Sequence, residues 1–174
     1  MSGIKLFFDS SALMAGIISG QGAARALLLL CEDERLTITV SEQVITEVER
    51  NLARKAPRAL PYAREMILRA NLSIVRDPLP DELQPRADWI SHPADLPILV
   101  AAARARVDFL VTLNTRHFIE DGEVARKSGL RIGTPGDALK WVRERISISR
   151  GDAGNAESKK DLKVKRYYFI NAAD

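Results

Sequence analysis

The sequence predicts an α/β protein with three layers, in which helices cover both faces of a central parallel sheet of four to five strands. Short apolar segments rich in strand-forming residues alternate along the chain with segments of helical periodicity. Such alternation is typical of parallel sheets joined by helical crossovers. Several strand segments are nearly continuous in apolar residues, as expected for strands that are buried on both faces.

Five segments have the composition of strands. IKLFF at 4–8 is apolar, and LTITV at 36–40 is β-branched and alternates in polarity. The segments 72–76 and 109–113 are similar, and 130–132 is the weakest of the set. We therefore expect five strands in this order along the chain.

Helical segments separate these strands. Residues 42–55 repeat apolar side chains at helical spacing, and Pro57 ends that helix. Residues 77–88 are rich in proline and acidic residues and predict a loop with a short helix. The run Thr134-Pro135-Gly136-Asp137 is typical of a capped helix start, which gives Asp137 a structural role. The predicted helices are 23–31, 42–55, 58–70, 96–106 and 135–146.

The domain boundary is predicted near Ile148. Residues 1–148 are long enough for one domain with an ordinary core. Residues 149–158 are small and polar, which is typical of a linker. We therefore interpret 149–174 as a charged C-terminal extension outside the core.

Composition limits the classes of function. The formal net charge of +3 permits a nucleic-acid partner without requiring one. A single cysteine, Cys31, excludes an internal disulfide and a cysteine-based zinc site, and we expect it to be a small buried hydrophobe. The chain has no apolar run of eighteen residues, and its start is too short for a signal peptide. These features favour a cytoplasmic protein.

Polar residues from four separate segments fall at one edge of the predicted sheet. Ligands of open α/β sheets bind outside the carboxyl ends of the strands. Asp9 directly follows the first strand, and Thr112 and Asn114 end the strand at 109–113. Glu47 lies in the first turns of the helix after the second strand, and Asp95 opens the helix that precedes the 109–113 strand. All of these positions map to the carboxyl edge.

A group of carboxylates at one edge favours a divalent cation, because the carboxylates repel one another. Hard oxygen ligands select Mg²⁺ or Mn²⁺, and such an ion can activate water and stabilise charge on a phosphodiester. The chain offers little else for catalysis. Its only histidines are His92 and His117, and it contains neither a nucleophile elbow nor a phosphate-binding loop.

Each of these acids also has a structural alternative. Asp9 and Asp95 both precede helices and could act as N-caps. Glu47 and Glu49 flank the two sides of one apolar stripe, so periodicity does not choose between them. Three arginines, Arg50, Arg54 and Arg58, have helical spacing, but the break at Pro57 favours a solvated face over an RNA-binding track.

Four motifs, in order, resemble those of PIN domains. Phe7-Phe8-Asp9-Ser10-Ser11-Ala12-Leu13 is similar to the opening motif, an apolar strand ending in Asp. Ser41 to Val48 resembles the second motif, which has a helix-starting Ser and a Glu six residues later. Asp95 to Ala102 resembles the third motif and Phe109 to Phe118 the fourth. The resemblance covers about 4–146 and favours Glu47 over Glu49.

The resemblance implies a PIN-like fold and a Mg²⁺- or Mn²⁺-dependent nuclease that acts on RNA. By resemblance, Asp9, Glu47 and Asp95 hold the metal, while Ser11 and Thr112 orient the carboxylates or the attacking water. Many bacterial and archaeal members are VapC-type toxins held inactive by a small antitoxin. The family habit, with the apolar helices at 23–31 and 58–70, also implies a homodimer.

One position departs from the family pattern. The fourth motif often carries Asp where this chain has Asn114, which leaves three carboxylates and puts a second metal in doubt. Asn114 can still offer a carbonyl oxygen and is counted with the catalytic residues. Glu120 or Asp121 could supply a fourth acid if the segment after His117 folds back.

Two other functions compete with the ribonuclease. The first is a catalytically weak PIN-like module that binds RNA or a protein partner without cutting it. The second is a phosphotransfer receiver or phosphatase on a similar sheet. A phosphatase would favour a second Asp two residues after Asp9, where this chain has Ser11. A receiver would need an acidic pair beside the first strand and a late lysine, and neither is visible.

Overall fold

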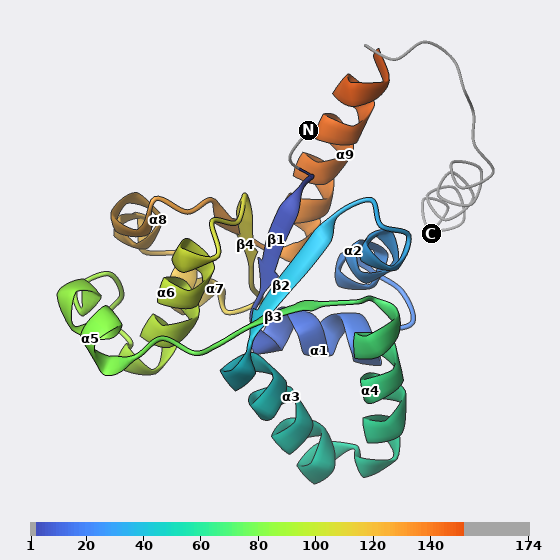
Figure 1. Ribbon diagram of the computed structural model, residues 1–174, viewed down its shortest axis with the longest axis horizontal. Helices are drawn as coiled ribbons and strands as arrows, with labels where there is room; N and C mark the ends of the chain where they lie inside the picture. The colour runs from blue at the N-terminus through green and yellow to red at the C-terminus, as the bar shows by residue number, and fades with distance from the viewer. Residues whose placement is uncertain (1–2, 152–174) are drawn as a thin grey trace.

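The protein has a five-stranded parallel sheet, as predicted. A computed structural model describes residues 3–151. The strand order is β3-β2-β1-β4-β5, and every neighbouring pair is parallel (Figure 1). The strands are β1 (Lys5–Phe8), β2 (Thr37–Ser41), β3 (Ser73–Val75), β4 (Phe109–Val111) and β5 (Ile132–Gly133).

Helices pack on both faces of the sheet and give the predicted three layers (Figure 1). On one side α1 packs against α2, α3 and α4, and α2 packs against α9. On the other side α6 packs against α5 and α8. The helices are α1 (Ser10–Ile18), α2 (Ala23–Glu32), α3 (Glu42–Lys55), α4 (Leu60–Arg69), α5 (Pro80–Leu83), α6 (Leu96–Arg104), α7 (Thr115–Phe118), α8 (Gly122–Ser128) and α9 (Pro135–Gly151). Single 3₁₀ turns occupy Pro57–Ala59, Gln84–Arg86 and Pro93–Asp95.

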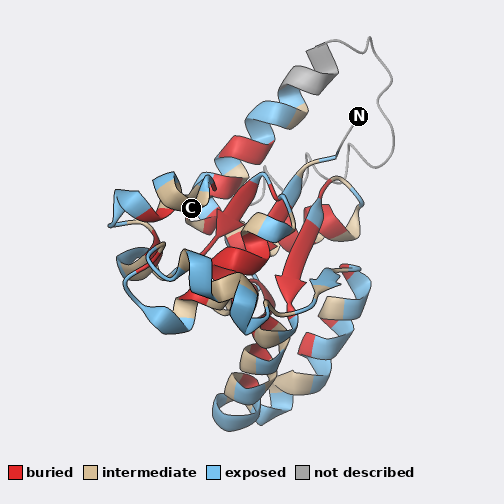
Figure 2. Ribbon diagram, turned by 60° about the vertical axis from the view of Figure 1, so that its left-hand side comes forward, coloured by how far each residue is buried: buried red, intermediate tan, exposed pale blue. Residues whose placement is uncertain are grey.

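The centre of the sheet is fully buried, which fixes the register of the strands. Phe7 and Phe8 of β1 pair with Leu110 and Val111 of β4, and none of the four is exposed to solvent. Figure 2 shows these central strands as buried elements beneath the helices. A slip of one residue would exchange the faces of every side chain in a strand, so burial on both faces specifies one register.

Pairing of β1 with β4 creates the point at which the chain order of the sheet reverses. From β1 the chain first moves toward β3, and it later returns to place β4 and β5 on the other side of β1. Ligand sites of open α/β sheets form at such a point, outside the carboxyl ends of the strands. The residues that follow Phe8 and Val111 meet there, and the Asp9 backbone N–H donates to the Val111 carbonyl at 3.1 Å.

Local details agree with several sequence predictions. Thr134 and Asp137 form the predicted cap of α9, since the Asp137 carboxylate accepts from the Thr134 backbone N–H at 2.9 Å. In return the Thr134 hydroxyl accepts from the Asp137 backbone N–H at 3.2 Å. Cys31 is buried as expected, and burial raises the pKa of its thiol.

The C-terminal part of the core differs from the predicted boundaries. Helix α9 continues beyond the predicted end at 146 to Gly151, so 149–151 are helical where we expected a linker. Two short helices, α7 and α8, were not predicted because each has too few residues to show periodicity. The rest of the predicted extension, 152–174, lies outside the described residues, and its separation from the core stays a prediction.

Within residues 3–151, no single helix is long and apolar enough to cross a membrane. Helices α1 and α2 meet that test only when taken together, and their axes differ in direction by 86°.

Candidate functional site

Asp9 is a buried carboxylate at the carboxyl end of the central strand. Only 5% of the residue is exposed, and three donors hold its two oxygens. The Ser11 hydroxyl donates to Oδ1 at 2.7 Å, the Ala12 backbone N–H donates to the same oxygen at 2.8 Å, and the Thr112 hydroxyl donates to Oδ2 at 2.5 Å. Asp9 therefore caps α1, as its structural alternative predicted, and it also lies at the carboxyl edge of the sheet.

The two hydroxyls that bind Asp9 are fixed by the backbone that follows β4. The Ser11 hydroxyl accepts from the Leu113 N–H, and the Thr112 hydroxyl accepts from the Asn114 N–H, each at 2.9 Å. Their protons are thereby directed at the carboxylate. The geometry matches the positioning role that the family resemblance implies for Ser11 and Thr112.

Burial dominates the electrostatics of Asp9. Loss of hydration raises the pKa of its carboxyl above the ordinary value, the three hydrogen bonds oppose that rise, and the negative charge of Asp95 adds to it. No Lys or Arg pairs with Asp9 among the described residues.

Asp95 does not act as a helix cap. It precedes α6, but its side chain accepts no hydrogen bond from the first turn of that helix. Instead its Oδ2 lies 2.6 Å from His117 Nδ1, 3.2 Å from His92 Nδ1 and 3.4 Å from Asn114 Nδ2. The helix-capping role that the sequence offered for Asp95 is therefore not seen, and its carboxylate contacts the two histidines and Asn114 in its place.

Glu47 occupies the predicted position near the start of α3. Ser41 caps this helix by accepting from the Val44 N–H, as the second motif implied. Glu47 is half-buried, and its Oε1 accepts from Gln43 Nε2 at 2.9 Å. No direct bond joins it to Asp9 or Asp95 in the described part of the chain. Glu49 forms an ion pair of 2.8 Å with Arg64 of α4. Within residues 3–151, Asp9, Glu47 and Asp95 do not form a group whose ligand atoms all lie within 4.8 Å of one another, so their meeting at one ion stays a prediction.

Asn114 has both a structural and a site contact. Its Oδ1 accepts from the His117 backbone N–H at 3.4 Å and caps α7, while its Nδ2 faces Asp95. The residues considered as a fourth acid lie apart from this cluster. Asp121 caps α8 by accepting from the Glu123 N–H, and within residues 3–151 neither it nor Glu120 bonds to Asp9, Glu47 or Asp95.

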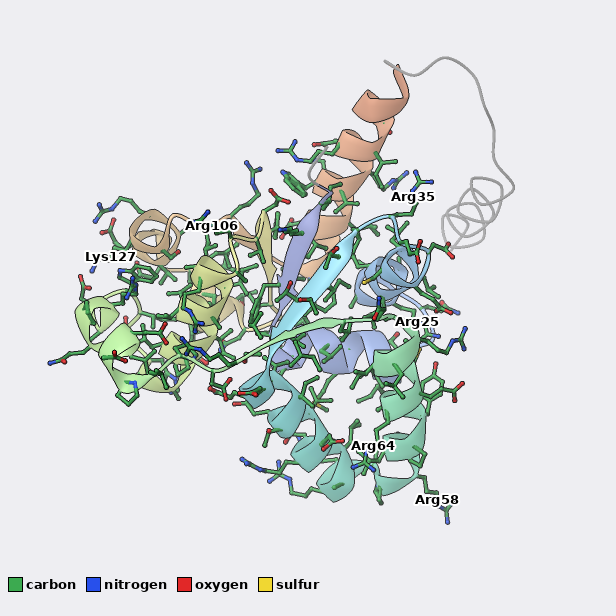
Figure 3. All side chains as sticks on the ribbon, in the orientation of Figure 1. Arg25, Arg35, Arg58, Arg64, Arg106 and Lys127 are labelled. Carbon is green, nitrogen blue, oxygen red and sulfur yellow. The ribbon has the colours of Figure 1, made fainter. Side chains whose placement is uncertain are left out.

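Positive charge is spread over the molecule. Figure 3 places Arg58 and Arg64 beside α4, Arg25 and Arg35 near α2, and Lys127 at α8. Arg50, Arg54 and Arg58 are exposed, in agreement with a solvated face.

Sequence reasoning gave no role to the two histidines. His92 and His117 stack with ring centroids 4.3 Å apart, and both contact the same oxygen of Asp95. The sequence held one signal for these histidines, namely their distance from predicted site residues. His92 stands three residues before Asp95, and His117 stands three residues after Asn114.

Comparisons with known proteins agree with the motifs. A family model described as a PIN domain matches residues 5–116. The fold is similar to PAE2754 from Pyrobaculum aerophilum, with 17% identity, a TM-score of 0.57 and coverage of 81% of this chain and 90% of that chain. It is also similar to VapBC2 from Rickettsia felis, solved with a DNA fragment from their promoter, with 19% identity, a TM-score of 0.55 and coverage of 75% and 98%. The search of curated proteins finds no match.

We predict that Asp9→Asn stabilises the metal-free protein at neutral pH. Because the pKa of Asp9 is raised, the folded state resists ionisation of this carboxyl. The contribution of Asp9 to stability is therefore fully present below the ordinary carboxyl pKa and is lost as pH rises through the raised pKa. Asn keeps the cap, and the Thr112 hydroxyl can accept from its amide. Single stabilising substitutions commonly gain about 0.5–2 kcal/mol, and we expect a gain within this range.

Thermal unfolding in EDTA at pH 7 tests this, with Asp137→Asn, at the exposed cap of α9, as the matched control. Hydrogen bonds from Thr134 lower the pKa of Asp137, so its replacement is expected to destabilise. An unfolding midpoint for Asp9→Asn at or below the wild-type value would contradict the prediction.

Proposed function

The chain belongs to the PIN-domain family, and on this basis we propose that it is a metal-dependent endoribonuclease that hydrolyses RNA phosphodiester bonds. The observation that carries the proposal is the buried carboxylate of Asp9 at the carboxyl end of β1, which is held by three donors and pairs with no Lys or Arg within residues 3–151. A buried carboxylate of this kind is expensive unless a ligand compensates its charge.

The donor set fits a hard divalent cation. Asp9, Asp95 and Glu47 offer carboxylate oxygens, the ligands that Mg²⁺ and Mn²⁺ prefer. We propose that these three residues hold the ion. When bound, the ion supplies an activated water and stabilises negative charge on the phosphodiester. A divalent cation among three carboxylates leaves a net charge near −1, so the acids balance the ion without excluding it.

The residues around Asp9 position the site. The Ser11 and Thr112 hydroxyls donate to separate oxygens of its carboxylate and fix its orientation. Asp9 starts α1, so the same bonds couple the site to the helix that covers β1. Asn114 joins the end of β4 to Asp95 through its amide, and we count it among the catalytic residues for that reason.

The proposed partners are an RNA substrate and a small antitoxin protein. The similar structure from Rickettsia felis is named as a VapBC complex, which favours a toxin of a toxin–antitoxin pair. We also propose a cytoplasmic location for this RNA-cleaving activity. The RNA substrate would approach the carboxyl edge, where Arg116 at the start of α7 is exposed.

The alternative function is a PIN-like module that binds RNA or protein without cutting it. Two observations favour this reading. Asn114 stands where a fourth acid is common, and within residues 3–151 Asp9, Glu47 and Asp95 do not form a group of ligand atoms that all lie within 4.8 Å of one another. Cleavage separates the alternatives.

Cleavage is predicted to require both a divalent ion and Asp9. Purified protein should cut a mixture of RNAs with Mn²⁺ or Mg²⁺ and should not cut in EDTA. Asp9→Asn removes a charged ligand while preserving shape, and we expect at least about a hundredfold loss, comparable with the removal of one group that stabilises transition-state charge. Asp88→Asn, at an exposed carboxylate that pairs with Lys127, is the control and should cut normally. Wild-type rates for Asp9→Asn would overturn the assignment.

Asn114 is predicted to tune the affinity for the ion. Asn114→Asp adds a negative charge and should tighten Mn²⁺ binding at least about fivefold, because a unit charge 4 Å away contributes about 1 kcal/mol even in water. Asn114→Ala removes the contact with Asp95 and should weaken both binding and turnover. Calorimetric titration of Mn²⁺ into the three proteins measures this. Equal affinities would reduce Asn114 to the cap of α7.

We also propose that the protein is a homodimer. Large apolar side chains remain exposed on α4 and at β3, an edge strand, with Leu68 79% and Ile74 54% exposed. We propose that these side chains contact a second copy of the chain, because apolar surface exposed to water favours association. Sedimentation at micromolar concentration should show twice the chain mass of 19.3 kDa. A species of 19.3 kDa alone would reject the dimer.

A further inference from the structure

Both histidines of the chain converge on one carboxylate oxygen. His117 Nδ1 lies 2.6 Å from Asp95 Oδ2, and His92 Nδ1 lies 3.2 Å from the same atom. The three residues offer ligand atoms that all lie within 4.8 Å of one another. They come from two segments, the turn before α6 and the start of α7, which the fold brings together at the carboxyl edge of the sheet.

The donors around one oxygen of Asp95 also lie close to one another. His117 Nδ1 lies 2.6 Å from Oδ2, and Asn114 Nδ2 lies 3.4 Å from the same oxygen and 3.1 Å from Nδ1. If Nδ1 carries a proton, both nitrogens donate to Asp95 Oδ2. If Nδ1 carries a lone pair, it accepts from Asn114 but faces a carboxylate lone pair at 2.6 Å. A cation bound by Nδ1 and Oδ2 takes the place of the shared proton, because both atoms then act as ligands.

The cluster also lacks a competing cation. Within residues 3–151, Asp95 pairs only with the two imidazoles, and no Lys or Arg neutralises it. The one cysteine, Cys31, is buried with its thiol donating to the Ala70 carbonyl, so no thiol takes part. The available donors are therefore two imidazole nitrogens and one carboxylate oxygen.

We propose that His92, Asp95 and His117 form a binding site for a transition-metal ion, with Zn²⁺ as the preferred occupant. Imidazole nitrogen binds Zn²⁺ well, whereas Mg²⁺ prefers oxygen donors. Two histidines and one carboxylate are a common zinc donor set, which leaves a position for water. The site is thus chemically distinct from the all-oxygen centre around Asp9.

The exposure of the histidines allows this coordination. The His117 side chain is 30% exposed and is held close to Asp95, while that of His92 is 51% exposed. The two rings stack with an angle of 21° between their planes, so their Nδ1 lone pairs do not yet converge on one point. Rotation of the exposed His92 ring brings its nitrogen toward the ion and opens the stack.

Asp95 belongs both to this site and to the proposed acidic centre, so an ion at one site affects the other. This coupling rests on the proposed nuclease function, whereas the binding of Zn²⁺ does not. An ion held by the two histidines draws Asp95 away from the Mg²⁺ or Mn²⁺ centre, so Zn²⁺ is expected to inhibit cleavage. His92 lies outside the proposed catalytic set, and His92→Ala is therefore expected to cut RNA normally and to resist this inhibition.

Direct titration of the full-length protein with Zn²⁺ tests the proposal. Calorimetry measures affinity for Zn²⁺ and, in parallel, for Mg²⁺. Nuclear magnetic resonance of the imidazole rings reports the ligands, because the sequence contains only two histidines. The variants are His92→Ala, His117→Ala and His117→Gln, the last to keep a polar side chain if Ala unfolds the chain. Asp9→Asn is the matched control, and circular dichroism checks that each variant is folded.

We expect one equivalent of Zn²⁺ to bind more tightly than Mg²⁺ and to shift both imidazoles. Each histidine variant should lose at least about tenfold in Zn²⁺ affinity, since replacing a residue that only hydrogen-bonds to a metal ligand already costs about 10–100-fold. The Zn²⁺ affinity of Asp9→Asn should not change. Unchanged affinity in the folded histidine variants, a shift of only one imidazole, or a loss confined to Asp9→Asn would overturn the site. Failure of RNA cleavage alone would reject the nuclease and leave this result standing.

Discussion

The hydrogen bond from the Thr112 hydroxyl to the Asp9 carboxylate joins the ends of β1 and β4, the two strands between which the chain order of the sheet reverses. Burial of a carboxylate costs several kcal/mol unless hydrogen bonds or a cation compensate it. Three donors supply part of that compensation here, and they come from the first turn of α1 and from β4. The remaining charge makes this edge of the sheet a natural place for a divalent ion.

Two kinds of donor lie side by side at this edge. Asp9 is surrounded by hydroxyl and amide donors, whereas Asp95 is surrounded by imidazole nitrogens. Asp95 takes part in both groups, since its charge also raises the pKa of Asp9. Under the proposed zinc site, an ion held by the histidines would compete for Asp95 with the ion of the acidic centre.

Much of the fold followed from sequence because burial leaves a strong pattern. Apolar strands and the position of Asp9 at the end of one of them were readable directly, and the parallel sheet is confirmed. The choice between Glu47 and Glu49 could not be made from the periodicity of the sequence, because both residues flank one apolar stripe. It depended on the family resemblance and stays a prediction. The histidine cluster could not be predicted, because His92 and His117 are far apart in the chain and come together only in the folded structure.

The most direct test of the account is an anomalous difference map from crystals of the protein grown with Mn²⁺. We expect a peak in coordination contact with the Asp9 carboxylate, with Asp95 and Glu47 as further ligands. The absence of a peak beside Asp9 at a Mn²⁺ concentration that supports RNA cleavage would contradict the central claim that these three acids form the catalytic metal centre.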